Sequence, residues 1–469
     1  MSDALDTPVF DPILLDRYGG YGPRYTSYPT AVQFHEGFGP PEHRLAARQS
    51  NNDALPAPLS LYVHVPFCES PCFYCACNRV ISRQHQLAGP FLAHLAKEIR
   101  LQGELFDQDR VVSHIHLGGG TPTWLDTAQL RQLMDTIRQH FTVSSAPDRQ
   151  ISIEIDPRTV DRPKLAELKE LGFNRLSFGV QDLNPSVQAA VNRQQSTDSI
   201  EQVLSDARNL GFDSLAIDLI YGLPLQTPES FARTVEQIIA WAPDRLSVFN
   251  YAHMPAMFPG QRQIHEADLP SDMARLSMFQ QATERLLAAG YRFIGLDHFA
   301  REDNELVQAA NAGRLCRNFQ GYSTEGHCDL IGLGPSAISH IGDSFSQNAK
   351  VLRDYYRRLD EERLPVVRGY QRNTDDRLRA AVIESIMCRG KVDFSAVEHA
   401  YELSMHRYFA EEWSQLEAMV NDGLITLGTQ DLTVTSRGRL LLRSIASVFD
   451  AYMMEPNGQQ QGPRFSRVV

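Results

Sequence analysis

The sequence of 469 residues lacks features that mark several classes of protein. It contains no run of about 18 apolar residues, the length that a membrane-spanning helix needs. It has no excess of basic residues either, because 45 lysines and arginines are outnumbered by 57 aspartates and glutamates. A net charge of −12 argues against general binding to nucleic acid or to an anionic membrane surface, since both require a basic surface. We therefore expect no membrane and no nucleic acid among its partners.

The first residues also lack a basic segment followed by an apolar core, so we expect no secretory signal peptide. Cysteine is scarce, with seven residues in the chain. We expect these thiols to stay reduced and the protein to be cytoplasmic, because disulfides belong to oxidising compartments. Apolar residues make up 42% of the sequence, which is enough for a large buried core.

Four of the seven cysteines lie within ten positions. Cys68, Cys72 and Cys75 have the spacing C-x3-C-x2-C, and Cys77 follows. Three thiolates at this spacing can reach three irons of one [4Fe-4S] cluster and leave the fourth iron to an outside ligand. Zinc sites more often use two separated cysteine pairs, and the remaining cysteines stand singly (Cys316, Cys328, Cys388). We predict three cluster ligands, with Cys77 a non-ligand beside the cluster. A zinc site or structural thiols are the alternative.

Predicted strands and helices alternate from Leu59 onward, and the cysteine motif directly follows the first strand. The strands are Leu59–Val65, Val111–Leu117, Ile151–Ile155, Arg175–Val180, Ser214–Ile220 and Arg245–Tyr251. The helices between them are Pro90–Leu101, Ala128–Ile137, Arg162–Leu171, Ser199–Leu210 and a helix capped by Thr227 that ends near Trp241. Six such units predict an α/β fold, a partial (β/α)6 TIM-like barrel with a parallel sheet.

Polar residues and glycines follow the ends of these strands, where barrels of this kind carry their chemistry. Gly118–Thr121 follows the second strand, Glu154 ends the third, and Gln181, Asp218 and Ala252 belong to the next three. Each has a plainer interpretation. The glycines can form a tight turn, Glu154 and Asp218 can form structural ion pairs, with Arg175 or Arg193 as partners of Glu154, and His64 and His116 are expected to be packed histidines.

The rest of the chain divides into an arm and a second unit. We expect residues 1–50 to form an N-terminal arm over the active site, and 51–365 the barrel with an extension in which 303–345 is irregular. Residues 366–469 are predicted to form a mostly helical, winged-helix-like domain. Its helices are expected near Asp376–Cys388, Tyr408–Asp422 and Gly438–Ser447. We interpret this domain as a cover for the barrel and not as a DNA-binding unit, since fold alone does not imply function.

Several longer motifs carry a family resemblance. GPRYTSYPT at 22–30, LGGGTPT at 117–123, DLIYGLPLQTPESF at 218–231 and RNFQGY at 317–322 resemble the bacterial oxygen-independent coproporphyrinogen III oxidases, and the cysteine motif resembles that of the radical S-adenosylmethionine (SAM) superfamily. The similarity extends from about residue 12 to Phe465–Arg467. The arm with PRYTSYPT separates the chain from the haem-chaperone relatives of this family.

The resemblance implies a radical SAM barrel, a [4Fe-4S] cluster and SAM, with two SAM molecules per chain. It implies that the propionates of rings A and B of coproporphyrinogen III become vinyl groups with loss of CO2, giving protoporphyrinogen IX for haem synthesis. A 5′-deoxyadenosyl radical made from SAM abstracts the hydrogen, and an unidentified electron donor and acceptor take part. We expect a monomer. The alternatives are a haem-binding chaperone on the same barrel and another radical SAM enzyme, such as a methyltransferase.

The resemblance also implies site residues. Cys68, Cys72 and Cys75 ligate the cluster. The residues that contact SAM are Tyr62, Tyr74, Gly119, Gly120, Thr121, Glu154, Gln181, Arg193, Asp218, Ala252 and Ile338. We add the hypothesis that Arg24, in the arm, contacts a substrate carboxylate. Ala76 and an insert at Gln459–Gly462 depart from the family pattern, and neither falls on a predicted ligand.

Overall fold

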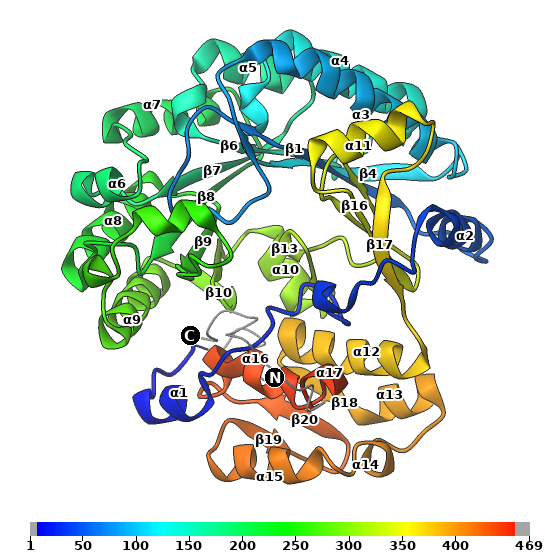
Figure 1. Ribbon diagram of the computed structural model, residues 1–469. Helices are drawn as coiled ribbons and strands as arrows, with labels where there is room; N and C mark the ends of the chain where they lie inside the picture. The colour runs from blue at the N-terminus through cyan, green and yellow to red at the C-terminus, as the bar shows by residue number, and fades with distance from the viewer. Residues whose placement is uncertain (1–6, 455–469) are drawn as a thin grey trace.

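The computed structural model describes residues 7–454, so the C-terminal motif and the insert at Gln459–Gly462 lie outside the described residues. Its centre is a sheet in which six parallel strands stand side by side in chain order: β1 (Leu59–Val65), β4 (Val111–Gly119), β6 (Gln150–Ile155), β7 (Arg175–Gln181), β8 (Ser214–Tyr221) and β9 (Arg245–Asn250). The sheet curves into an open arc (Figure 1). All six strands were predicted, and the predicted partial barrel is confirmed.

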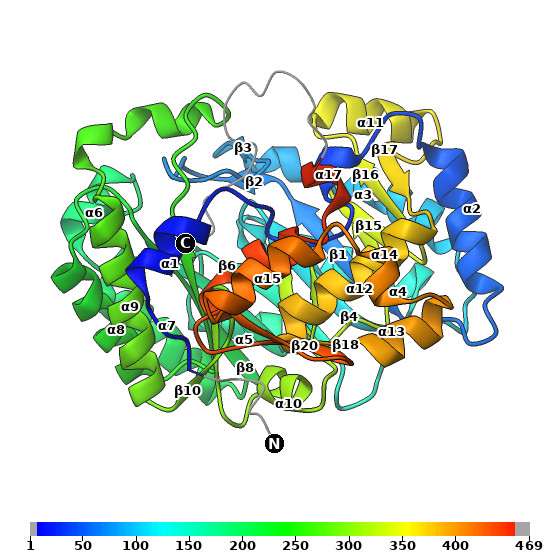
Figure 2. The same cartoon turned by 90° about the horizontal axis from the view of Figure 1, so that it is seen from below.

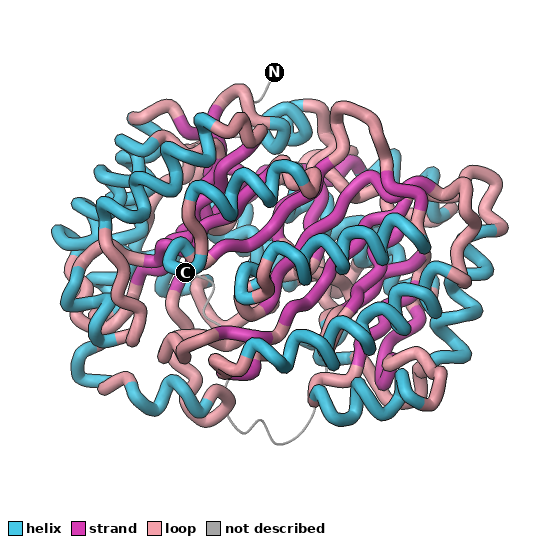
Figure 3. The backbone as a smooth tube through the Cα atoms, turned by 90° about the horizontal axis from the view of Figure 1, so that it is seen from above, coloured by secondary structure: helices cyan, strands magenta, loops and turns pink. Residues whose placement is uncertain are grey.

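Helices cover the outer face of this arc (Figures 1 and 3). They are α3 (Ala88–Gly103), α4 (Thr127–His140), α5 (Arg162–Glu170), α6 (Pro185–Ala190), α7 (Thr197–Asn209), α8 (Pro228–Trp241) and α9 (Asp272–Ala288). Side-chain caps decide where several of them begin, because the first amides of a helix lack partners within it. The Thr227 side chain accepts from the Ser230 amide at the start of α8, as the sequence predicts.

Alternation along the strands separates the core from the interior of the arc. In β7, Leu176, Phe178 and Val180 are buried, whereas Ser177 and Gly179 between them line a cavity. Because successive side chains of a strand point to opposite faces, one face packs on the helices and the other carries polar groups inward. The polar residues of the predicted site therefore share the inner face.

The sheet continues beyond the six units on both sides. β14 (Asp329–Leu333) lies parallel to β1, and antiparallel β15 (Ile338–Ile341), β16 (Ser344–Asn348) and β17 (Val366–Gln371) follow it. At the other end lie β11 (His298–Arg301) and β10 (Tyr291–Gly295). Smaller elements are β2 (Phe67–Cys68), β3 (Val80–Ile81), β5 (Thr142–Val143) and α11 (Leu352–Asp360).

The prediction that 303–345 is irregular is wrong. This region holds α10 (Glu305–Asn311), a hairpin of β12 (Cys316–Asn318) and β13 (Gly321–Ser323), and then β14 and β15. Its strands are short, and β14 depends on pairing with β1, which lies more than 260 residues earlier in the chain. Such pairing leaves no local periodicity in the sequence.

The C-terminal part packs α12 (Thr374–Arg389) and α16 (Leu442–Ser447) together beside a small sheet of β18 (Lys391–Asp393), β20 (Asp431–Val434) and β19 (Ile425–Leu427). α13 (Phe394–Tyr401), α14 (Met405–Tyr408), α15 (Trp413–Asn421) and α17 (Ala451–Met454) complete it. The single helix predicted for Tyr408–Asp422 is wrong, because the chain turns between α14 and α15. In that turn the buried Glu412 forms an ion pair with Arg379 at 2.9 Å. Figure 2 shows these helices lying across the open side of the arc.

The N-terminal segment runs between the barrel and the C-terminal part (dark blue in Figure 1). It contains α1 (Pro12–Tyr18) and, after an extended stretch, α2 (Pro40–Asn51). Arg17 pairs with Asp422 at 2.7 Å and Arg437 pairs with Asp11 at 2.6 Å, so the start of the segment is tied to the C-terminal part. No helix between residues 7 and 454 is long and apolar enough to cross a membrane.

One buried carboxylate ties the helical layer to the sheet. Glu98 of α3 is 0% exposed and accepts hydrogen bonds from the Gly334 amide at 2.7 Å, from Asn348 Nδ2 at 2.6 Å and from the Tyr355 hydroxyl. Burial raises its pKa to about 7, although the three hydrogen bonds oppose the shift. Glu98 thereby fixes the turn between β14 and β15.

This shift predicts a dependence of stability on pH. The native state binds the Glu98 proton more tightly than the unfolded chain, so the free energy of unfolding should fall as pH rises from about 4.5 to about 7. Glu98→Gln cannot titrate, so its stability relative to wild type should rise by roughly 1–3 kcal/mol over this interval. Urea unfolding at several pH values measures the difference. Glu104→Gln, at the exposed end of α3, is the control. Parallel pH profiles for wild type and Glu98→Gln would contradict the prediction.

Candidate active site

A cavity of about 550 Å³ occupies the interior of the arc and reaches the carboxyl ends of its strands. Most of the predicted site residues line it, from loops and strands that are far apart in the sequence: Cys68, Cys72, Tyr74, Cys75, Gly119, Gly120, Thr121, Glu154, Gln181, Arg193 and Asp218. The parallel sheet explains why they meet, because the carboxyl ends of all its strands face the same side.

The cysteine loop leaves β1 and is held by its own backbone. The Ser82 amide donates to the Cys68 carbonyl oxygen at 2.9 Å, and the Cys75 amide donates to that of Cys72 at 3.2 Å. The Arg79 guanidinium closes the loop by donating to the carbonyl oxygens of Cys72 at 3.3 Å and Cys75 at 2.9 Å. These contacts leave the thiols free to face the cavity.

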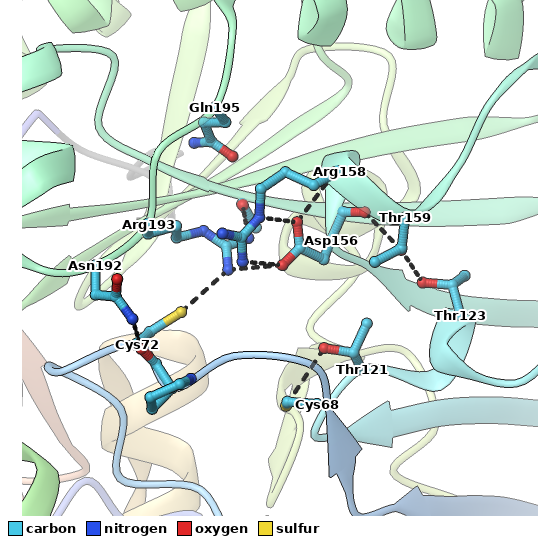
Figure 4. A network of polar contacts seen from close by, with 12 residues as sticks. Cys68, Cys72, Thr121, Thr123, Asp156, Arg158, Thr159, Asn192, Arg193 and Gln195 are labelled. Carbon is cyan, nitrogen blue, oxygen red and sulfur yellow. Dashed lines mark hydrogen bonds and ion pairs between the residues drawn. The ribbon is translucent and has the colours of Figure 1, made fainter. Parts of the chain in front are cut away.

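Each of the three predicted ligand sulfurs receives one hydrogen bond at 3.4 Å. Thr121 Oγ1 donates to Cys68, Arg193 Nη1 donates to Cys72, and the Cys77 amide donates to Cys75. Figure 4 shows the first two. A hydrogen bond from the Cys77 side chain is the main reason that the pKa of Cys75 falls to about 6, and the Cys77 amide adds a smaller lowering, whereas burial raises the pKa of Cys68 to about 11. Donors placed on sulfur stabilise bound thiolates and tune an iron–sulfur cluster.

The chemistry of the three thiols fits an iron–sulfur cluster. Cys68, Cys72 and Cys75 are free of disulfides and line the same cavity. Soft thiolates are the ligands that the irons of a [4Fe-4S] cluster prefer. The three cysteines therefore suit such a cluster, with one iron left to an outside ligand.

A buried ion-pair network supports the Cys72 side of the loop (Figure 4). Arg193 is 7% exposed and pairs with Asp156 at 3.0 Å, and Arg158 pairs with the same carboxylate at 2.6 Å. Burial raises the pKa of Asp156. The two guanidiniums lower this pKa by more than burial raises it, so the carboxylate stays charged. Asn192 Nδ2 adds a hydrogen bond to the Pro71 carbonyl oxygen at 2.7 Å. The sequence interpretation missed Asp156 and Arg158, although both directly follow the end of a predicted strand.

The glycine motif is required by close packing. Gly119 has φ +113°, a conformation that other residues rarely adopt. A Cβ on Gly118 would lie 2.8 Å from Glu154 Oε1, and one on Gly120 would lie 2.7 Å from the Phe67 carbonyl oxygen. The motif thus brings backbone amides to the cavity, and the Gly119 amide donates to Glu154 Oε2 at 3.1 Å.

Glu154 does not form the ion pair that the plainer interpretation offered. Its partner is His116, with Nε2 3.1 Å from Oε1, whereas Arg175 pairs with Glu305 and Arg193 with Asp156. Burial raises the pKa of Glu154, but His116 and the Gly119 amide lower it more, so its carboxylate is kept ready for a cationic ligand. His116 packs as expected, with its ring stacked on Tyr62 and bonded to Ser152, and it also lines the cavity.

Two further polar groups face the cavity. Asp218 has hydrogen bonds with Ser247 and, at 3.4 Å, with Ser177 Oγ, but burial raises its pKa to about 6. Gln181 Oε1 is buried and has no hydrogen-bond partner. An unsatisfied buried acceptor is costly, so a ligand with hydroxyl or amine donors fits this part of the cavity. SAM has such donors on its ribose, its adenine and its amino group.

Three residues that are predicted to contact SAM are not among those that line the cavity: Tyr62, Ala252 and Ile338. The Tyr62 ring stacks on His116, with centroids 5.9 Å apart. The carbonyl oxygen of Ala252 accepts from Gln261 Nε2 at 3.2 Å, and this amide also donates to the Tyr74 carbonyl oxygen. Ile338 begins β15 and pairs with Gln347. Tyr62 and Ala252 are thus linked to residues that line the cavity, His116 and Tyr74, whereas the Ile338 partner does not line it.

Arg24 is also placed beside the cavity. Its guanidinium forms an ion pair with Asp297 and lies 5.7 Å from the centroid of the Phe249 ring. Phe249 lines the cavity, as does His298, whose Nδ1 is 2.7 Å from Asp297 Oδ1. The arm thus places a cation next to two residues that line the candidate active site.

Comparison with known proteins shows which family this chain belongs to. The radical SAM superfamily model matches residues 62–238, and the HemN C-terminal domain model matches 373–441. Oxygen-independent coproporphyrinogen III oxidase of Pseudomonas aeruginosa is 50% identical over 465 residues, which cover 99% of this chain and 100% of that protein. The chain belongs to the oxygen-independent coproporphyrinogen III oxidases. The Escherichia coli enzyme is 46% identical over 460 residues, covering 98% of each chain.

The solved structure of coproporphyrinogen III oxidase (HemN) from Escherichia coli, a radical SAM enzyme, agrees with this assignment. It superposes on this member of the family with a TM-score of 0.90 at 46% identity, covering 95% of this chain and 100% of that one. The resemblance drawn from the sequence motifs is therefore confirmed, together with the radical SAM fold.

Proposed function

We propose that the protein converts coproporphyrinogen III to protoporphyrinogen IX by oxidative decarboxylation of the ring A and ring B propionates, a coproporphyrinogen III dehydrogenase activity in haem synthesis. The observation that carries this proposal is the meeting of three free cysteine thiols with a glycine-lined cavity at the open end of the barrel, in a chain that matches this family over nearly its whole length. An unactivated C–H bond requires a stronger hydrogen acceptor than any side chain, so a cofactor must supply the chemistry.

The residues of the cavity have distinct tasks in this proposal. Cys68, Cys72 and Cys75 hold a [4Fe-4S] cluster, which together with SAM supplies a 5′-deoxyadenosyl radical. Glu154 faces the amino group of SAM, and Asp218 faces its ribose hydroxyls. The remaining contacts are proposed for Tyr62, Tyr74, Gly119, Gly120, Thr121, Gln181, Arg193, Ala252 and Ile338. By holding the reacting groups in place, these residues lower the entropy cost of the reaction.

The proposal also covers the number of SAM molecules, the electron partners and the assembly state of the protein. We propose two SAM molecules per chain, an electron donor and an acceptor of unknown identity, and a cytoplasmic monomer. The arm and the C-terminal part are proposed to exclude water and oxygen from the cavity. Their mutual contacts support this role, because Arg443 Nε donates to the Pro23 carbonyl oxygen at 2.9 Å and holds the arm across the opening.

An anaerobic assay tests the function. The protein is reconstituted with iron and sulfide and incubated with SAM, a reductant, coproporphyrinogen III and cell extract as a source of the acceptor. We expect protoporphyrin after oxidation of the products, in step with 5′-deoxyadenosine. Formation of 5′-deoxyadenosine with unchanged substrate would contradict the substrate assignment. Tight haem binding without either product would favour a chaperone, and a methylated product a methyltransferase.

A further inference from the structure

Three arginines from distant parts of the chain gather beside the candidate active site. Arg24 comes from the arm, Arg317 from β12 and Arg443 from α16. Arg24 forms an ion pair with Asp297, and Arg317 Nε donates to the Arg24 carbonyl oxygen at 3.0 Å. Arg443 holds the neighbouring backbone of the arm through the Pro23 carbonyl oxygen. The three elements are thus joined around one point.

The three arginines and Asp297 together carry a positive charge, although the net charge of the whole protein is negative. Asp297 is the carboxylate that acts on all three guanidiniums. Burial, with Arg24 adding to it, lowers the pKa of Arg317 and brings that of Arg443 to about 9. His298, which also faces Asp297, has its pKa lowered by burial. A second anion at this point would stabilise the charged arginines.

Arg317 and Arg24 can each interact with such an anion. Arg317 Nη1 is buried and has no hydrogen-bond partner among the described residues. The Arg24 side chain keeps 34% of its surface exposed, so a ligand can reach it. A guanidinium presents donors in a planar fork that matches a carboxylate.

The surfaces next to the arginines suit a pyrrole ring. Arg317 lies 4.7 Å from the centroid of Tyr322, and Arg24 lies 5.7 Å from that of Phe249. Both rings line the cavity, and His298 stands between them, edge-on to each. A ligand that carries both aromatic rings and carboxylates would therefore contact the wall and the arginines together.

The arginines also lie far from the cysteine loop. The loop follows β1, whereas Asp297 follows β10, and six strands separate β1 from β10 in the sheet. Figure 1 shows these two strands on different sides of the arc. A carboxylate held at the arginines is therefore across the cavity from the thiols.

We propose that Arg24 and Arg317 bind a propionate carboxylate of the tetrapyrrole that is not decarboxylated and is kept in the product. Arg443 is a positioning residue that holds the arm in place. This inference rests on the proposed function, because it requires a porphyrinogen in the cavity. The retained propionate is not consumed in the reaction. Its contact with Arg24 and Arg317 can therefore hold the ring system through both decarboxylations.

The test compares two ligands. Coproporphyrinogen III carries all four propionates, whereas protoporphyrinogen IX carries only the two that are retained. Anaerobic equilibrium dialysis against cluster-loaded protein, followed by oxidation and porphyrin fluorescence, gives the affinity for each. Arg24→Gln and Arg317→Gln should weaken binding of both ligands by a similar factor, roughly ten- to a hundredfold. Arg317→Lys should restore part of the loss, because it keeps the charge without the fork.

Arg437→Gln is the matched control, because Arg437 also joins the arm to the C-terminal part but pairs with Asp11 instead. SAM binding and iron content, unchanged in every variant, show that the protein is folded. Unchanged affinities in both Arg24→Gln and Arg317→Gln, with normal wild-type turnover, overturn this inference alone. A loss confined to coproporphyrinogen III overturns it as well, since the anchored carboxylate would then be a reacting one. A wild-type protein that binds neither porphyrinogen overturns both the inference and the proposed substrate.

Discussion

Cys68→Ser should abolish formation of both 5′-deoxyadenosine and protoporphyrinogen IX, a loss of at least a thousandfold in rate. A serine hydroxyl is a hard and weakly acidic ligand, whereas the iron of a cluster prefers a soft thiolate. Thr121 Oγ1 would keep its place near the new side chain, so the change removes the ligand and little else. Iron and sulfide content after anaerobic reconstitution, together with 5′-deoxyadenosine formation, measure the effect.

Cys328→Ser is the matched control, because Cys328 precedes β14 at the opposite end of β1 from the cysteine loop and lies 3.6 Å from Ser113 Oγ. It should keep both the cluster and the activity. A Cys68→Ser protein that retains full iron content and turnover would rule out the proposed ligand set. Cys77→Ser should keep its iron, because the Cys77 amide still donates to Cys75 Sγ and a serine hydroxyl can donate in place of the thiol.

Arg193→Gln should reduce the rate of SAM cleavage roughly a hundredfold and lower the free energy of unfolding by about 3 kcal/mol. Arg193 is almost fully buried, and it joins the Asp156 carboxylate to the Cys72 sulfur and to the Gly179 carbonyl oxygen. Its removal leaves Asp156 with Arg158 as its remaining cation and leaves Cys72 without its donor. Stability is measured by urea unfolding of the metal-free protein, and cleavage by 5′-deoxyadenosine formation.

Arg158→Gln separates the two roles of Arg193. The Arg158 side chain shares Asp156 but is 28% exposed, and its Nε and Nη2 donate hydrogen bonds to that carboxylate. We expect a smaller loss of stability and near-normal cleavage. Equal losses of cleavage in the two variants would show that the charge balance at Asp156 matters and that the contact with Cys72 does not.

The repeating part of the fold could be read from the sequence because its signals are local. The predicted strands and helices of the six units agree with the observed ones to within three residues at each end. Apolar alternation, proline at first turns and capping residues such as Thr227 each act within a few residues. The rim of the barrel followed from the topology, because parallel strands bring their carboxyl ends together.

Errors arose where distant segments decide the structure. The region 303–345 was taken as irregular, although β14 forms by pairing with β1 and the β12–β13 hairpin packs against α12. The break between α14 and α15 follows from the ion pair of Glu412 with Arg379, thirty-three residues earlier. Neither partner is visible in a local window of sequence.

The candidate active site shows the same difference between local sequence signals and contacts between distant segments. The sequence by itself determined the positions of the cysteine motif, the glycine motif and the acidic residues at the strand ends, because each sits at a fixed spacing within one strand–loop unit. Only the tertiary structure decided the partners: His116 for Glu154, Asp156 for Arg193, and the meeting of Arg24, Arg317 and Arg443 around Asp297. The physical reason is that electrostatic and hydrogen-bond partners are selected by distance in space, which a curved sheet and a crossing arm set independently of distance along the chain.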